Sequence, residues 1–139
     1  MKYKSQGPFF VIRIDKGEEI FSSLIQFCKE NNISSGSFVG IGATAKAELA
    51  VYDLEKKQYN IKTYNQPLEI TNITGNITLM DNEPVVHAHI TLSDEQMNVV
   101  GGHMKSAVVS LTCEIYLTKL DAQINRKKDE ETGLNLLDL

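Results

Sequence analysis

The sequence predicts one α+β domain, on three observations. Its 139 residues are the usual length of a single domain. One segment, from about residue 17 to about residue 31, carries apolar residues at the spacing of a helix. Seven other segments are short, rich in β-branched and aromatic residues, and separated by turn formers. One helix among many predicted hairpins is typical of α+β proteins.

The first predicted elements are a strand over Phe9–Ile14 and the helix that follows it. Asp15 and Glu18 have the spacing of a capping box, which predicts that the helix opens at this point. Asn31-Asn32 predicts its end. Its apolar stripe indicates a helix packed on one face, and consists of Ile20, Phe21, Leu24, Ile25, Phe27 and Cys28.

The remaining predicted strands are Phe38–Ile41, Ala47–Tyr52, Tyr59–Tyr64, Leu68–Leu79, Val85–Leu92 and Val108–Leu117. The longest of them, Leu68–Leu79, holds apolar residues of opposite parity and a glycine, which predicts a β-bulge near Thr74-Gly75. After Asp121 the chain is polar and then apolar again. This tail is expected to be a solvated loop that leads to a short terminal strand.

Composition limits the function classes. The net charge is −4, so a homotrimer would carry −12, which argues against nonspecific binding of nucleic acid. Cys28 and Cys113 each fall in an apolar pattern and are expected to be reduced core thiols. No stretch is long enough to cross a membrane, and the first residues do not have the pattern of an export signal. We therefore expect a cytoplasmic protein.

The run Gly40-Ile41-Gly42-Ala43-Thr44-Ala45 matches the GxGxxA form of a dinucleotide-binding fingerprint. Such a site needs alternating strands and helices, whereas the residues after Tyr52 are predicted to form consecutive hairpins. The glycines are therefore interpreted as a tight turn or a close approach of two backbones, and no nucleotide cofactor is predicted.

All three histidines of the chain, His87, His89 and His103, fall within 17 residues. In the strand that holds the first two, the even positions are apolar and the odd positions are polar, so His87 and His89 share the polar face. If Ser93–Met97 is a five-residue hairpin loop, His103 lies opposite His87 and Gly101 opposite His89. The glycines would then leave room for a metal.

Three imidazoles with an open fourth position are the ligand set of catalytic zinc sites, and other divalent transition metals that favour imidazole are alternatives. The competing interpretation is that the histidines are polar strand residues or hydrogen-bonded partners of one another. One difficulty is that His103 has the same parity as the apolar residues of Val108–Leu117. Either a bulge near Lys105-Ser106-Ala107 switches the faces, or the histidines lie against a curved, partly buried surface.

The segments Glu83–Asp94 and Val99–His103 closely resemble the signature of the plants-and-prokaryotes conserved domain, or PPC domain. The similarity covers nearly the full chain. It includes Arg13 in the first strand, the helix, Gly40–Ala43, Leu68–Ile70 before Thr74–Asn76, and Glu131–Leu134.

The resemblance implies one PPC-like domain over residues 1–139, with a mostly antiparallel, strongly curved sheet flanked by one helix. It also implies a homotrimer and a metal held by His87, His89 and His103. Plant members carry separate AT-hook segments for DNA, and this sequence contains no such hook.

Three functions follow as hypotheses. The first and favoured one is a trimeric module that binds a metal, zinc above all, and a small ligand. The second is a metal-dependent enzyme that activates a metal-bound water, with Glu69, Asp94 or Glu114 as general base. The third is a DNA-associated regulator of the PPC family, which the acidic balance does not support.

Overall fold

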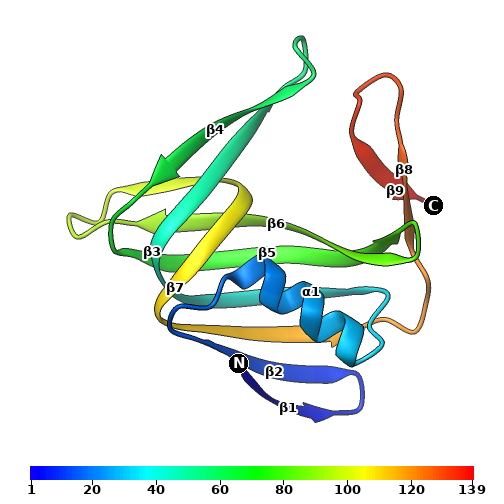
Figure 1. Cartoon of the computed structure of the whole chain (residues 1–139), viewed down its shortest axis with the longest axis horizontal. Helices are drawn as coiled ribbons and strands as arrows, with labels where there is room; N and C mark the ends of the chain where they lie inside the picture. Colours follow the sequence, from blue (N-terminus) through cyan, green and yellow to red (C-terminus); the bar gives the residue numbers. More distant parts are fainter.

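The computed structural model describes residues 1–139 and shows a strongly curved β-sheet with a single helix against it (Figure 1). This confirms the predicted α+β class. The elements are β1 (Lys2–Gln6), β2 (Phe9–Asp15), α1 (Ile20–Glu30), β3 (Gly36–Asp53), β4 (Gln58–Tyr64), β5 (Leu68–Met80), β6 (Glu83–Ser93), β7 (Val99–Lys119), β8 (Asn125–Lys128) and β9 (Asn135–Asp138).

The sheet is antiparallel except for one short parallel contact between β5 and β8. Four strands form a closed circuit, because β3 pairs with β5 and β7, and β6 also pairs with both of these strands. The long strands β3 and β7 each change partners along their length. Closure of this circuit explains the strong curvature, since a flat sheet cannot return to its first strand.

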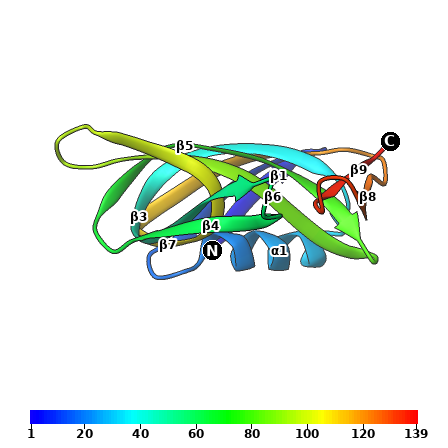
Figure 2. The same cartoon turned by 90° about the horizontal axis from the view of Figure 1, so that it is seen from above.

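Helix α1 covers one face of the sheet (Figure 2). Its buried stripe packs on the inward residues of the strands in one hydrophobic core. Phe27 is fully buried, and its ring meets Tyr3 and Phe10 edge-on at centroid distances of 5.0 and 5.4 Å. Cys28 and Cys113 lie in the same core as free thiols, as predicted. The helix has 11 residues, and no helix of the structure is long and apolar enough to span a bilayer.

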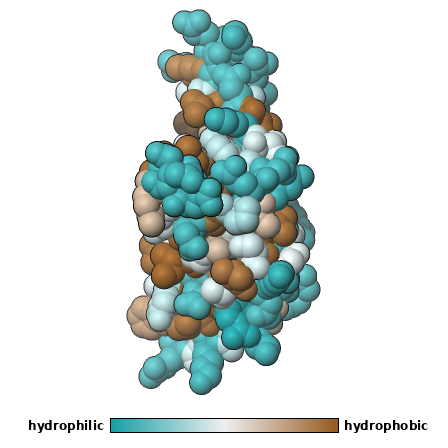
Figure 3. Space-filling model, turned by 90° about the vertical axis from the view of Figure 1, so that its left-hand side faces the viewer, coloured by the Kyte–Doolittle hydropathy of each residue, from teal (hydrophilic) through white to brown (hydrophobic).

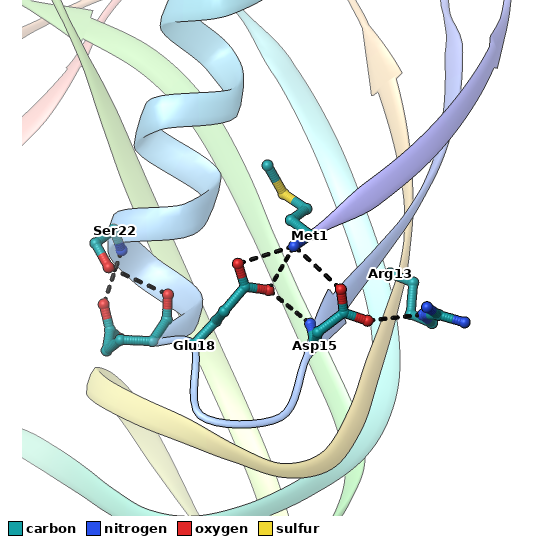
Figure 4. Close-up of polar contacts among 6 residues, drawn as sticks. Met1, Arg13, Asp15, Glu18 and Ser22 are labelled. Carbon is teal, nitrogen blue, oxygen red and sulfur yellow. Dashed lines mark hydrogen bonds and ion pairs between the residues drawn. The ribbon is translucent and has the colours of Figure 1, made fainter.

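The start of the helix differs from the prediction. Asp15 ends β2, and the N-cap is Glu19, whose carboxylate accepts hydrogen bonds from the amides of Phe21 and Ser22. The Glu18 carboxylate instead accepts from the Asp15 amide at 2.7 Å and from the Met1 amino group at 2.8 Å (Figure 4). The predicted Asp15–Glu18 contact therefore exists, but it closes the turn before the helix. The end at Asn31 was predicted correctly.

Several strand boundaries also differ. The two predicted strands on either side of residue 44 are one continuous strand, β3, and β1 was not predicted. The bulge in β5 lies at Thr71, where the register with β6 shifts, and not at Thr74-Gly75. The tail forms the two-stranded hairpin β8–β9 rather than a loop with one strand.

The glycines of the fingerprint-like run lie inside β3, between β5 and β7, and no helix follows them. A Cβ added to Gly40 would lie 2.6 Å from the carbonyl oxygen of Glu114. A close approach of backbones, rather than a tight turn, is therefore the reason for glycine here.

Candidate metal centre

Strand β6 presents two of the three histidines on the face that points away from the core. Its even positions from Val86 to Leu92 are buried, whereas His87 is half-buried and His89 is exposed. The neighbouring strand β5 places Asn76 beside His87 and Thr74 beside His89. The alternation predicted from the sequence is confirmed.

The hairpin that brings in the third histidine has a register different from the predicted one. The loop is Asp94–Asn98, one residue later than expected, so His103 pairs with His89 rather than with His87. The Asp94 carboxylate explains the shift, because it accepts hydrogen bonds from the amides of Gln96 and Asn98 at 3.0 and 2.9 Å. The pairing of the two strands therefore shifts by an even number of residues. Because side chains alternate between faces, His103 stays on the same face as predicted.

The three imidazoles form one cluster. Ring centroids are 5.1 Å apart for His87 and His103, 5.4 Å for His87 and His89, and 5.7 Å for His89 and His103. One ring nitrogen of each lies within 4.8 Å of the others. Nitrogens on one tetrahedral zinc are about 3.3 Å apart, a spacing that rotation of these side chains can reach.

A β-bulge at Lys105 solves the parity difficulty. In the pairing of β3 with β7, Leu49 is opposite Met104 and Glu48 is opposite Ser106, so Lys105 is the extra residue. Met104 and Ala107 are therefore both buried although their parity differs. Of the two alternatives that the sequence left open, the structure has the bulge. It places His103 on the outer face of β7 and lets residues further along the same strand face the core.

An aromatic side chain that the sequence did not suggest covers His103. Tyr59 of β4 stacks on its ring with 5.0 Å between centroids, and Tyr52 meets Tyr59 edge-on at 5.0 Å. The Lys105 ammonium lies 4.7 Å from the centre of the Tyr59 ring. No local pattern indicates this aromatic layer, since Tyr59 is 44 residues before His103.

Arg126 of β8 is the other neighbour that the sequence did not reveal. Its Nη2 lies 3.5 Å from Nδ1 of His87. The guanidinium also donates to Thr78 Oγ1 and Asn76 Oδ1 at 2.8 Å and to the Asn135 carbonyl at 2.7 Å. The tail expected to be a solvated loop therefore supplies a side chain to the cluster.

The surroundings keep two of the imidazoles neutral. Burial, followed by the charge of Arg126, lowers the pKa of His87. Burial, followed by the neighbouring His87 and Lys105, lowers the pKa of His103 to about 4. A neutral imidazole is the form that binds a metal, so both side chains are ready to act as ligands at pH 7.

The three carboxylates suggested as general bases are not part of the cluster, which contains only the histidines. Glu69 and Glu114 line an open hollow of about 410 Å³ whose lining includes no histidine. Asp94 is engaged in the hairpin loop.

The two glycines before His103 lie on opposite faces of β7. Gly101 lies on the same face as His103, whereas a Cβ on Gly102 would lie 3.0 Å from the Ala50 carbonyl.

Comparison with solved structures shows the same architecture in several prokaryotic proteins. A protein from Bacteroides thetaiotaomicron, provisionally named as DNA-binding, is 34% identical, with a TM-score of 0.96 over 99% of this chain and 96% of its own. A Ralstonia eutropha protein with the same provisional name is 33% identical, with a TM-score of 0.93 over 99% and 96%. The metal-containing protein AF0104 of Archaeoglobus fulgidus is 35% identical, with a TM-score of 0.88 over 98% of each chain.

No match was found among curated proteins. The family model of the Plants and Prokaryotes Conserved domain, abbreviated PCC or PPC, matches residues 1–121. This stretch contains the helix, seven of the strands and all three histidines. The chain therefore belongs to the Plants and Prokaryotes Conserved domain family.

Proposed function

We propose that the protein is a homotrimeric module that binds a divalent transition metal, zinc above all, and a small ligand. His87, His89 and His103 are the metal ligands. The observation that carries the proposal is the convergence of three imidazole nitrogens within 4.8 Å. The metal-containing relative from Archaeoglobus, at 35% identity, supports it.

The donor set fits such an ion. Imidazole nitrogen is a preferred ligand of zinc and its neighbours in the periodic table, whereas calcium and magnesium take oxygen ligands. When bound by three imidazoles, zinc retains one exchangeable position and acts there as a Lewis acid. The protein's own contribution is to keep His87 and His103 neutral and to hold His103 under Tyr59.

The outer face of the sheet supports the trimer. Val11, Tyr116 and Val39 form one row across β2, β7 and β3, and they are 45%, 63% and 52% exposed. Ile41 and Leu111 extend the same apolar area at 59% and 69% exposure. By contrast, the end of the molecule at the β6–β7 turn shows apolar atoms scattered among polar ones (Figure 3). A contiguous apolar area of this kind is typical of a subunit contact.

Metal analysis of the purified protein tests the central claim. We expect about one metal ion per chain in the wild type and none in a His87→Ala, His89→Ala, His103→Ala triple variant. Thr91→Ala is the matched control, because Thr91 lies on β6 two residues beyond His89. Equal metal content in the wild type and the triple variant would contradict the proposal.

The assembly is tested by light scattering after size exclusion. The wild type should have the mass of three chains, and Tyr116→Glu should dissociate it by placing a charge in the apolar row. Thr118→Glu, further along β7, provides a control for the added charge. A monomeric wild type would exclude the trimer.

DNA association is the second candidate, because two relatives at 33% and 34% identity carry provisional names of that kind. A trimer of this chain would be strongly acidic, which opposes contact with phosphates. A gel shift with micromolar protein at physiological salt decides the matter, and we expect no shifted band.

The domain and the compartment belong to the same proposal. We infer that residues 1–139 form one domain, since β8 pairs with β5 and Arg126 reaches His87. Two free core thiols are compatible with the reducing cytoplasm.

A further inference from the structure

Arg126 is a half-buried cation beside the histidine cluster without an opposite charge. Each of its three donors to the protein serves a neutral acceptor, on Thr78, Asn76 and Asn135. No carboxylate lies within 4.0 Å of its guanidinium. Removing a charge from water without a counter-ion is unfavourable, so this arrangement favours an anion that comes from solution.

A second cation flanks the cluster from another element. Lys105 lies over the Tyr59 ring, and Tyr59 stacks on His103. Its ammonium forms neither an ion pair nor a hydrogen bond with a protein group. Arg126 on β8 therefore lies next to His87, and Lys105 on β7 lies over the ring that stacks on His103.

The charges around the cluster are thus of one sign. Neutral imidazoles leave the two charges of a divalent ion uncompensated, and the two neighbouring side chains add two more. We propose that the ligand of this site is an oxyanion, a small carboxylate or phosphate compound, which Arg126 and Lys105 bind together with the metal. This inference rests on the metal centre proposed above.

The structure also explains how Arg126 is kept in place. The Tyr52 hydroxyl donates to the Thr132 carbonyl at 2.7 Å, and the Lys57 ammonium donates to the Glu130 carbonyl at 2.9 Å. These bonds connect the β3–β4 hairpin to the loop between β8 and β9, the two projecting hairpins of Figure 1. Oxyanion recognition therefore depends on residues beyond the stretch 1–121 that the family model matches.

The test uses the full chain loaded with Co²⁺, whose visible absorption changes when a new ligand enters its coordination shell. Acetate, inorganic phosphate and the neutral acetamide are titrated separately at constant ionic strength, and the metal content of each sample is measured. We expect saturable spectral changes with acetate, with phosphate or with both, and none with acetamide. The stronger of the two anions identifies the class of oxyanion.

Charge variants assign the effect to the two side chains. Arg126→Gln and Lys105→Gln should each weaken binding of the preferred anion by about tenfold or more, the usual effect of a lost charge-assisted hydrogen bond. The matched controls are Lys127→Gln, a neighbour of Arg126 on β8, and Lys62→Gln, which removes the other lysine placed over a tyrosine ring. Both controls should bind as the wild type does.

Arg126 also holds β8 in place, so its variant is checked by thermal melting, and Arg126→Lys restores the charge alone. Lys105 has no hydrogen bond to lose, so Lys105→Gln tests the proposal even where Arg126→Gln does not fold. Unchanged affinity in Lys105→Gln and in a folded Arg126→Gln, or equal binding of acetamide and acetate, would overturn the inference. A wild type that takes up no cobalt would overturn the metal centre itself, and that result appears in the metal analysis before any anion is added.

Discussion

The ring of Tyr59 stacks on the imidazole of His103, with 23° between their planes. The two residues lie on strands that do not pair, since β3 runs between them: Ala50 is opposite Ile61 of β4 and opposite His103 of β7. Tyr59 thus reaches across a strand to touch a candidate ligand. The orientation of His103 therefore depends on a strand that contains no candidate ligand itself.

Tyr59→Leu should weaken zinc binding by about 3- to 10-fold, because a stacked aromatic pair contributes about 0.5–1.5 kcal/mol. Tyr59→Phe keeps the ring and should bind zinc as the wild type does. Competition with a chelating dye measures the affinity. Tyr64→Leu is the control, since Tyr64 belongs to the same strand but packs against the hydrophobic core. Equal affinity for zinc in Tyr59→Leu would show that the stacking does not orient the ligand.

The metal-free protein should lose stability as the pH falls from about 6.5 to about 4. In the unfolded chain His103 takes up a proton near pH 6.5, whereas in the folded protein burial lowers its pKa to about 4. Within this window only the unfolded state binds the proton, so acid favours unfolding. His87, whose pKa is also lowered, acts in the same direction.

Urea unfolding at a series of pH values, with a chelator present, measures this dependence. In His103→Gln the free energy of unfolding should depend less on pH between 6.5 and 4 than in the wild type. A variant with an unchanged slope would show that His103 titrates normally in the folded protein.

The face that carries the histidines was predictable because it depends on local alternation. In β6, every second residue from Val86 to Leu92 is apolar, and this pattern alone places His87 and His89 together. Local alternation also showed that the faces conflict between His103 and Val109, but it left open whether a bulge or a curved surface resolves the conflict, and the structure has the bulge at Lys105. Local patterns of this kind require no knowledge of distant contacts.

Arg126 and Tyr59 were not predictable, because tertiary folding brings them to the cluster. Arg126 lies 39 residues after His87, in a stretch whose composition resembles a solvated loop. The hairpin register was missed for a local reason. The side chain of Asp94 caps the loop, and this contact moves the loop by one residue.

Glu19→Ala should destabilise the protein by about 1–2 kcal/mol, the usual effect of losing an N-cap. The Glu19 carboxylate accepts hydrogen bonds from two amides of the first helical turn and from the amide of Ala107 in β7. Thermal or urea unfolding measures the change. Glu30→Ala is the control, because Glu30 ends the helix and its carboxylate accepts a hydrogen bond only from the exposed side chain of Gln26. Equal stability of the two variants would contradict the capping role.

The two cysteines should not react with a thiol reagent in the native protein at pH 8. Burial raises the pKa of both thiols to about 12, so the reactive thiolate is nearly absent. Addition of denaturant should release two reactive thiols per chain, which a colorimetric assay counts. Rapid labelling of either cysteine without denaturant would contradict the buried positions in the core.

Gly42→Ala should destabilise the protein by about 1–3 kcal/mol or more, whether or not any ligand is present. A Cβ at this position would overlap the carbonyl oxygen of Thr112 and lie 2.7 Å from the Cα of Cys113. Both are backbone atoms of β7 and cannot rotate away, so the strands themselves must separate. Gly101→Ala should have a smaller effect, since its nearest contact is the Ile90 carbonyl at 3.1 Å. Unfolding curves of the two variants measure the difference. If Gly42→Ala were as stable as the wild type, packing of β3 on β7 would not be the reason for the glycine, and the fingerprint interpretation of this run would have to be reconsidered.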